Sequence, residues 1–322
     1  MNLDLIDRKL LYFLDINARQ NIATLAKKLH IGRNVALYRI NRLKEEGIIL
    51  GSFVEINNPL LGYFSFRIFL KLSNYTLEQE KALFDFLKKQ NNILWLSRVL
   101  GKWDLNPVFM TKNIKEFEIF RKELFLKFNS IIEDSKIALL TNIYYYPKSY
   151  LLGNMRKDHF TTILSIESES DYKADDNDEK LLALLSQDAT ISILDLSRKL
   201  RLSINTIKKR INNLEKHKII LGYRLFIDPS KLGYEYYKLH VTLRYYNKID
   251  LNSLRAWLGI QSSVIYTDHY MDSQAFEVEL HVKNEQEYIQ FLKNLKKEFS
   301  HIIKDSFYIK LYESQIYKYL PT

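Results

Sequence analysis

The chain has 322 residues, contains no cysteine, and carries 48 Lys and Arg against 38 Asp and Glu, a formal net charge of +10. The absence of cysteine excludes disulfides, thiolate zinc sites, iron–sulfur ligation and thiol nucleophiles, and no apolar run approaches the roughly 20 residues of a membrane helix. The length predicts at least two domains, and the positive charge indicates a polyanionic partner if it is concentrated on one surface.

One long segment of the chain occurs twice. Residues 7–63 align without a gap with residues 178–234. The run Ile-Ile-Leu-Gly at residues 48–51 returns at residues 219–222, and Leu-Gly-Tyr at residues 61–63 returns at residues 232–234. A match of this length and register indicates a tandem duplication, so we expect two copies of one functional unit.

Three short helices are predicted in each copy. In the first copy they are expected at residues 5–15, 22–29 and 33–46. Gly32 lies in a tight turn between the second and third helices, as a helix-turn-helix requires. In the second copy, Ser203 is a good N-cap for the third helix.

The third helix of each copy indicates the function. We expect its inward face to carry Val35, Ile40 and Leu43 in the first copy, matched by Thr206, Ile211 and Leu214 in the second. Basic and amide side chains dominate the other face, and these side chains reach phosphates and base edges from a helix in the major groove. The predicted DNA-binding residues are Arg33, Asn34, Tyr38, Asn41 and Arg42 in the first copy, and Ser203, Asn205, Lys208, Lys209 and Asn212 in the second.

Each copy is followed by the same order of strands and helices. A strand, a helix, two strands, a helix and a long strand are predicted at residues 64–72, 76–90, 93–100, 105–111, 114–128 and 131–146. The second half repeats this order at residues 236–245, 251–260, 264–270, 275–282, 285–299 and 302–319. The order βαββαβ is that of a ferredoxin-like fold. The sequence therefore predicts an α+β protein with two winged-type helix-turn-helix DNA-binding domains alternating with two ferredoxin-like domains.

A polar, acidic segment separates the two halves. Residues 154–176 are expected to form a linker, with a short strand possible at residues 159–165, where apolar side chains recur. The expected domains are residues 1–63 and 177–234, both helix-turn-helix, and residues 64–153 and 235–322, both ferredoxin-like.

The repeated motif resembles the Lrp/AsnC (feast/famine) transcriptional regulators of bacteria and archaea. The resemblance rests on Asp4, Asp7 and Leu10-Leu11, on Ala18-Arg19, Leu25-Ala26 and Arg39-Ile40, on the Gly-Ile-Ile-x-Gly run at residues 47–51, and on Leu61-Gly62. It implies that the ferredoxin-like domains sense ligands and form dimers. It also implies a small-molecule, amino-acid-like effector held near a Gly-x-x-Asp turn, which here is Gly101 and Asp104.

Two copies in one chain change what the resemblance implies. The family forms dimers by edge pairing and face packing, and we expect this chain to form that dimer within itself as an intrachain pseudo-dimer. Its two unequal reading helices would contact double-stranded DNA about one turn apart, on an operator that is a poor palindrome. The second copy departs from the family pattern at Lys218, which replaces a glycine, and at residues 269–273, where the glycine turn is lost. Assembly into a further homo-oligomer stays open.

Two other functions remain open. Sirohaem decarboxylases also resemble Lrp/AsnC proteins, and His240, His269 and His281 are the imidazoles that could serve such an enzyme. An architectural, nucleoid-associated DNA-binding protein is the second alternative. The sequence contains neither a P-loop nor a dinucleotide-binding fingerprint, so we expect no enzymatic activity, no cofactor and no catalytic metal. The absence of cysteine fits a reducing compartment, and we expect a cytoplasmic, nucleoid-associated location.

Positive charge is not confined to the predicted reading helices. Residues 64–150 carry 14 Lys and Arg against nine Asp and Glu, whereas residues 235–322 carry 11 of each. The helix-turn-helix interpretation does not account for the basic first sensing domain. We hypothesise that Lys88, Lys89, Lys112 and Lys115 contact additional DNA or an acidic partner.

Overall fold

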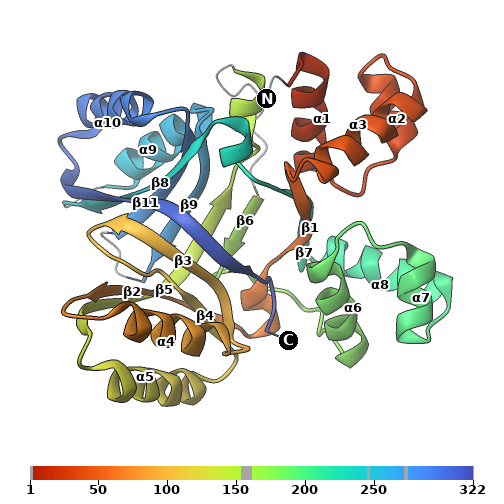
Figure 1. Ribbon diagram of the computed structural model, residues 1–322. Coiled ribbons are helices and arrows are strands. Elements are labelled where there is room, and N and C mark those ends of the chain that lie inside the picture. Colours follow the sequence, from red (N-terminus) through yellow and green to blue (C-terminus); the bar gives the residue numbers. More distant parts are fainter. Residues whose placement is uncertain (1–2, 154–161, 245–246, 272–274, 322) are drawn as a thin grey trace.

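Two three-helix units lie beside a large β-structure (Figure 1). A computed structural model describes residues 3–153, 162–244, 247–271 and 275–321. The first unit, here called the first head, contains α1 (Leu5–Ile16), α2 (Ile22–Lys28) and α3 (Arg33–Glu45). The second head contains α6 (Asp176–Gln187), α7 (Ile193–Leu200) and α8 (Ile204–Lys216). No helix among the described residues is long and apolar enough to span a bilayer.

The head helices begin at polar caps, with one exception. The side chains of Asp4, Asp175 and Ser203 each accept a backbone N–H at the start of α1, α6 and α8. The corresponding residue before α3 is Gly32, which has no side chain to cap the helix. α3, the third helix of the first head, therefore lacks the side-chain cap that stabilises its counterpart α8. These two helices are here called the recognition helices.

The apolar runs after the recognition helices form strands that join the two heads. β1 (Ile49–Ile56) pairs antiparallel with β7 (Ile220–Ile227), and this pair is here called the ribbon. α1 of the first head packs against β7, and α6 of the second head packs against β1. The backbone N–H of Ala18 accordingly donates to the carbonyl of Tyr223 at 2.8 Å. Each head is thus held by the strand of the other half.

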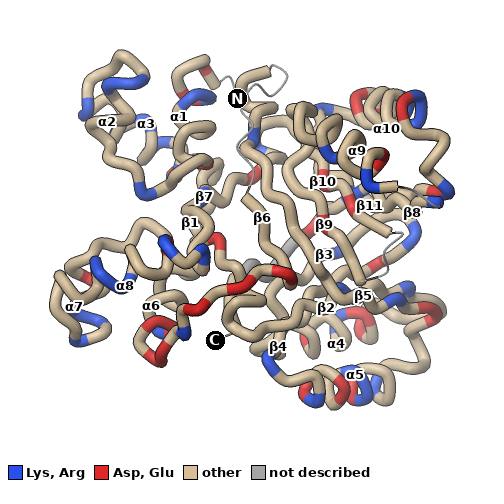
Figure 2. Tube along the Cα trace, turned by 180° about the vertical axis from the view of Figure 1, so that it is seen from behind, with Lys and Arg blue, Asp and Glu red and all other residues tan. Residues whose placement is uncertain are grey.

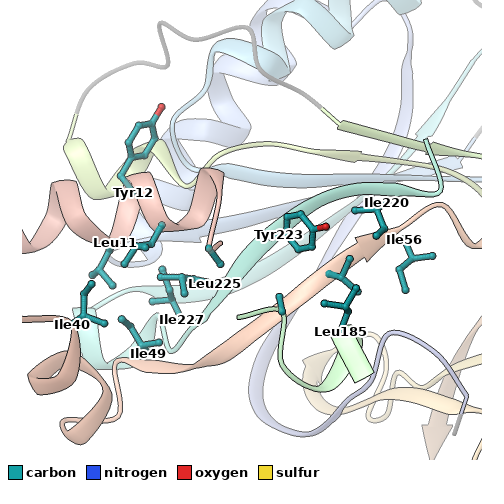
Figure 3. Packing of buried hydrophobic residues seen from close by; sticks show 14 of the residues in the cluster. Leu11, Tyr12, Ile40, Ile49, Ile56, Leu185, Ile220, Tyr223, Leu225 and Ile227 are labelled. Carbon is teal, nitrogen blue, oxygen red and sulfur yellow. The ribbon is translucent and has the colours of Figure 1, made fainter. Parts of the chain in front are cut away.

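The cores of the two heads merge around the ribbon (Figure 3). Leu11 and Ile40 of the first head, Leu185 of the second, and Ile49 and Leu225 of the ribbon belong to one buried cluster. Burial of a large aliphatic side chain contributes roughly 1.5–3 kcal/mol. The heads therefore share one hydrophobic core rather than being tethered modules.

The β-structure contains two ferredoxin-like sheets, which confirms the predicted fold class. The first sheet has the strand order β5-β2-β4-β3 and the second has β11-β8-β10-β9, all antiparallel. Their elements are β2 (Phe64–Leu72), α4 (Leu77–Lys88), β3 (Ile93–Gly101), β4 (Val108–Thr111), α5 (Ile114–Phe128) and β5 (Ile132–Tyr145), then β8 (Glu235–Leu243), α9 (Lys248–Ile260), β9 (Val264–Tyr270), β10 (Ala275–Val282), α10 (Glu285–Phe299) and β11 (Ile303–Tyr317).

The two sheets close into one eight-stranded barrel. β3 of the first half pairs with β11 of the second, and β5 of the first half pairs with β9 of the second. A further strand, β6 (Thr162–Ser165), pairs with β5 within the segment expected to be a linker, whose residues 154–161 lie outside the described part. Short 3-10 turns, η1 (Asn58–Leu61), η2 (Ser149–Leu152) and η3 (Ser230–Leu232), link the heads and ribbon to the barrel.

The four outer helices cover the barrel. α4 and α5 pack on the first sheet through an aromatic-rich cluster that includes Phe84, Phe117 and Phe120. α9 and α10 pack on the second sheet through a cluster that includes Leu254, Phe291 and Leu295. The opposite face of both sheets is enclosed in the barrel, where Phe69, Trp103 and Ile309 form a smaller apolar cluster. Both faces of the sheets are therefore covered.

The structure corrects the predicted inward faces of α3 and α8 and the predicted start of one strand. Val35 is 45% exposed, and the buried residues of α3 are Ala36, Ile40 and Leu43, which recur at helical spacing on one face. In α8 the buried residue is likewise Ile207, and Thr206 is only partly buried. The strand predicted from residue 105 begins at Val108, and Leu105 makes only isolated bridges to neighbouring strands.

Candidate nucleic-acid interface

The outer face of α3 presents polar and aromatic side chains to solvent. Arg33, Asn34 and Asn41 are exposed, and Tyr38 is 67% exposed. Val35 joins this face, although the sequence analysis placed it inward. An apolar side chain there could contact a thymine methyl group, whereas amide side chains pair with adenine edges.

The outer face of α8 is more basic. Asn205, Lys208, Lys209 and Asn212 are all exposed. Ser203 is exposed as well, but its hydroxyl accepts the backbone N–H of Thr206 at 3.1 Å. Its observed role is that of an N-cap, and any contact with DNA would be additional.

The two recognition helices share some positions and differ at others. The repeat aligns Asn34 with Asn205 and Asn41 with Asn212, so both heads keep the same two amides. It also aligns Tyr38 with Lys209, which are both exposed but differ in chemistry. The heads therefore present the same two amides and differ in the side chains around them.

Arg42 is placed differently from the other predicted contact residues. Its Nη2 donates to Oδ2 of buried Asp7 at 2.6 Å, and Arg39 donates to Oδ1 of the same carboxylate at 2.8 Å. Removing one partner of a buried ion pair typically costs about 3–5 kcal/mol. Arg42 therefore has a structural role in joining α3 to α1.

In the second head, the buried carboxylate equivalent to Asp7 is paired with partly different residues. Arg210 donates to Asp178 at 2.8 Å, as Arg39 does to Asp7. The position of Arg42 is taken by Asn213, and the hydroxyl of Tyr172 donates instead to Asp178 at 2.6 Å. Burial, together with this hydrogen bond, raises the pKa of Tyr172 to about 12. Tyr172 lies near the end of the acidic connecting segment, so this end of the segment is attached to the second head.

Charge along the chain is unevenly placed (Figure 2). Lys and Arg residues mark α2, α3, α7 and α8, whereas acidic residues mark the start of α6 and the segment before it. Lys112, one of the unexplained basic residues, donates to Glu179 of α6 at 2.6 Å. This ion pair links the first sensing sheet to the second head.

The predicted effector turn is built into the barrel. Gly101 ends β3 with φ +127°, and a Cβ there would lie 2.6 Å from the carbonyl oxygen of Tyr308 in β11. Asp104 accepts the backbone N–H of Leu72 at 2.7 Å and lies 3.2 Å from the Lys71 ammonium. Gly101 thus lies at the end of β3 and the Asp104 carboxylate at the end of β2, and an effector role for them stays a prediction.

The three histidines considered for an enzyme do not form one cluster. Nε2 of His240 lies 3.0 Å from the Glu277 carboxylate, and Nδ1 of His281 lies 2.9 Å from the Tyr150 hydroxyl. His269 packs between the rings of Tyr144 and Phe276. Burial lowers the pKa of all three, that of His269 to about 4, so each is neutral at pH 7.

Inside the barrel lies a group of buried charged side chains that was not predicted from the sequence. Arg67 and Lys238, which occupy equivalent positions in β2 and β8, meet three carboxylates, those of Asp268, Glu277 and Glu279. The three carboxylates lie within 4.8 Å of one another. Two cations already lie among them, so we assign no metal ion to this group. The polar alternation along β8 and β10 was the only signal that could have revealed it.

A cavity of about 680 Å³ lies between the ribbon and the barrel. Phe53 and Leu225 line it from the ribbon, and Arg67, Trp95 and Tyr236 line it from the barrel strands. Neither Gly101 nor Asp104 is among its lining residues. The volume lies in the range of small-molecule sites.

Comparison with known proteins agrees with the geometry of the heads. A family model described as winged helix-turn-helix DNA-binding matches residues 3–49 and 175–220. A helix-turn-helix transcriptional regulator of Pyrococcus abyssi is 38% identical over 116 residues, which cover 35% of this chain and 77% of the relative. The regulator Ptr1 of Methanocaldococcus jannaschii is 32% identical over 121 residues, which cover 38% of this chain and 80% of Ptr1.

One solved structure resembles the whole duplicated chain. The siroheme decarboxylase NirDL aligns with a TM-score of 0.64 over 98% of this chain and 94% of its own, at 12% identity. A likeness at this identity shows a shared fold. The regulator relatives, by contrast, match 35–38% of this chain and more than two thirds of their own length, and the family model for the heads matches the chain twice. The chain therefore belongs to the Lrp/AsnC family of helix-turn-helix transcriptional regulators, with the family's two-domain unit duplicated in tandem.

Proposed function

We propose that one chain binds double-stranded DNA as an intrachain pseudo-dimer and regulates transcription through two unequal recognition helices. The observation that carries this proposal is the ribbon, which joins a head from each half of the same chain. A conventional family dimer needs two chains to bring two heads together. Here the second head is supplied by the duplication.

The heads are held firmly enough to define a spacing on DNA. The N–H of Asn57 donates to the carbonyl of Ile219 at 2.9 Å, and the N–H of Asp228 donates to that of Ile48 at 3.0 Å. These reciprocal hydrogen bonds flank the ribbon at both ends. Because α1 and α6 also pack on the ribbon, we expect the two half-sites to lie about one helical turn apart.

The exposed side chains support unequal reading. The first head offers Val35 and Tyr38 beside Asn34, which suits A·T-rich sequence with its thymine methyl groups. The second head offers Lys208 and Lys209 beside Asn205, which suits phosphates and guanine edges. We therefore propose an operator with two dissimilar halves.

The fold shared with NirDL makes tetrapyrrole chemistry the second candidate. A related structure of NirDL is described as a complex with an iron-uroporphyrin III analogue. In this chain the cavity lining carries six carboxylates and four Lys or Arg residues. That charge opposes an acidic tetrapyrrole, and the separation of His240 from His269 and His281 offers no common ligand set. We therefore favour the regulator.

A selection of genomic fragments by the full-length chain tests the proposal. We expect the best fragment to bind at least about 1,000-fold more tightly than a scrambled duplex at physiological salt, with one chain per site by native mass spectrometry. Comparable affinity for both duplexes, lost on modest addition of salt, would instead indicate an architectural protein. Tight binding of uroporphyrin without selective DNA binding would favour the enzyme.

A further inference from the structure

The cavity between the ribbon and the barrel has walls suited to an organic ligand. Rings of Phe53, Trp95, Tyr145, Tyr236 and Tyr266 line it together with aliphatic side chains. Aromatic faces attract cations as well as apolar groups. Trp95 already contacts two cations: the guanidinium carbon of Arg67 lies 5.3 Å from the centre of its ring, and the ammonium nitrogen of Lys238 lies 3.8 Å from it. The walls therefore favour a ligand with a flat apolar body.

The buried charges at the base of the cavity do not balance. Asp268, Glu277 and Glu279 are each at most 1% exposed, and so is Lys238, while Arg67 is 2% exposed. Arg67 pairs with Asp268, and Lys238 donates to Glu279 at 2.7 Å and to Glu277 at 3.2 Å. Three carboxylates thus face two permanent cations. An uncompensated buried carboxylate is costly, so it must gain a proton or a cation.

The structure indicates which carboxylate is in excess. Burial, together with the nearby Glu279 and Glu277, raises the pKa of Asp268 to about 7. Burial also opposes ionisation of Glu277, but the nearby Lys238, Arg67 and His240 outweigh it and hold the pKa of Glu277 well below its ordinary value. Asp268 and Glu279 both line the cavity, whereas Glu277 does not. The excess negative charge therefore lies at the cavity surface.

The duplication explains why this arrangement is one-sided. Asp268 and Glu277 align with Ser97 and Asn106, and Glu279 aligns with Val108. The first half thus contributes one cation and no carboxylate to the group, and the second half contributes one cation and all three carboxylates. If the two halves were identical, each would contribute the same charges, and the carboxylates would not all come from the second half.

We propose that this cavity binds an amphipathic organic amine, whose ammonium group lies beside Asp268 and Glu279 and whose apolar body packs against the aromatic wall. The bound cation takes the place of the proton on Asp268. The site is separate from the turn at Gly101 and Asp104, which does not line the cavity. The ligand class is defined by its charge and shape, and the excess of carboxylates in the lining disfavours an anionic molecule of the same shape.

The cavity also touches the contacts that fix the first head. Lys148 lines it, and its ammonium donates to buried Asp15 of α1 at 2.5 Å. Glu55 lines it too, and it accepts from Arg224, which also donates to the Asp15 carbonyl at 3.2 Å. The equivalent positions of Asp15, Glu55 and Arg224 in the other copy are Ser186, Phe226 and Phe53. A ligand at this wall therefore acts on the first head more than on the second, and this regulatory consequence rests on the proposed function.

Fluorescence titration with pyrenebutylamine and pyrenebutyrate tests the ligand site without DNA. The two probes have the same apolar body and opposite charge. We expect the full-length chain to bind the amine at least about tenfold more tightly than the acid, and Asp268→Asn to weaken amine binding about tenfold. Glu123→Gln, on the exposed face of α5, is the matched control and should leave both affinities unchanged.

A second variant covers the case in which Asp268→Asn fails to fold. Ser65 lines the cavity wall outside the buried charge group, and Ser65→Lys should weaken binding of the amine and strengthen binding of the acid. Equal affinity for the two probes, tighter binding of the acid, or no saturable binding of the amine overturns the proposal.

DNA titrations with and without the amine then test regulation. The amine should change the DNA dissociation constant of the wild type about threefold or more and leave that of Ser65→Lys unchanged. Amine binding that leaves DNA affinity unaltered overturns the regulatory part, and failure to bind DNA at all counts against the proposed function while leaving the ligand site in place.

Discussion

Lys218 occupies a backbone position that its counterpart fills with glycine. Gly47 and Lys218 follow α3 and α8 at equivalent positions and have φ of 69° and 58°. In both heads the following N–H then donates to a carbonyl in the last turn of the helix, Leu43 or Leu214. Left-handed backbone costs an ordinary L-residue roughly 1–2 kcal/mol. Lys218 is therefore strained at a position where Gly47 is not.

Lys218→Gly should stabilise the chain. Relief of the left-handed strain outweighs the greater freedom of glycine in the unfolded state, and we expect a gain of roughly 0.5–1 kcal/mol. Gly47→Lys, the reverse change in the first head, should lose about as much. Chemical denaturation of both variants measures this, and a loss of stability in Lys218→Gly contradicts it.

Asp268 should make stability depend on pH. Its pKa is raised from 3.8 to about 7 in the folded chain, mainly by burial. Between these values the native state holds a proton that the unfolded state has released, so this carboxyl lowers stability as pH rises from about 4 to 7. Buried histidines with lowered pKa values act in the opposite direction below their ordinary pKa.

Comparison with Asp268→Asn isolates that contribution. The substitution can change the free energy of unfolding at every pH. It should also remove the contribution of Asp268 to the pH dependence, which is up to about 1.4 kcal/mol per pH unit. Urea denaturation at pH values from 5 to 8 would show the stability difference between variant and wild type changing in favour of the variant as pH rises. Parallel curves would mean that Asp268 is ionised throughout this range.

At the level of elements, two substitutions at the start of α8 can distinguish its contribution to stability from its contact with DNA. Ser203→Ala removes the cap and should cost about 1 kcal/mol. Ser203→Asp keeps an acceptor for the N–H of Thr206 and should retain stability, but its charge should weaken DNA binding if the helix start lies against a phosphate. Thermal unfolding and DNA titration of both variants decide this. Unchanged DNA affinity in Ser203→Asp would place the helix start away from the backbone.

The elements also show what a sequence can predict. α5, α10, β2, β9 and β10 have the predicted bounds because helical spacing and β-branched runs are local signals. The strands of the ribbon were not predicted, because they pair residues that lie far apart in the sequence, such as Ile49 and Ile227, and no local signal indicates such a pairing. The predicted inward face of α3 was wrong by one residue: Val35 was expected to be buried, but its small neighbour Ala36 is buried instead.

For the whole molecule, closure of the barrel depends on a close approach at Gly101. We expect Gly101→Ala to destabilise the chain by about 2–4 kcal/mol, because the new Cβ meets the Tyr308 carbonyl at 2.6 Å and φ is +127°. Gly51→Ala is the matched control: its φ is ordinary and no described atom outside its chain neighbours lies within 4 Å of the added Cβ. Equal effects on chemical denaturation would mean that the approach of β3 to β11 is not a constraint.

The candidate sites were predicted to different degrees. The DNA-facing residues of α3 and α8 could be named because the repeat and helical spacing define a face, although Arg42 proved to be paired with Asp7. The buried group around Asp268 could not, since charged residues alternating along β8 and β10 are equally typical of a solvated sheet face. The pairings of β3 with β11 and of β5 with β9, which close the barrel, enclose them.

Binding-site selection with head-specific variants tests the central claim most directly. Random duplexes are selected by the wild type, by Asn34→Ala with Asn41→Ala in the first head, and by Asn205→Ala with Asn212→Ala in the second, which are equivalent positions. The account predicts two dissimilar half-sites about one turn apart, with each variant relaxing preference in one half only. A perfect palindrome, or relaxation of the same positions by both variants, would contradict the claim that one chain reads DNA with two unequal heads.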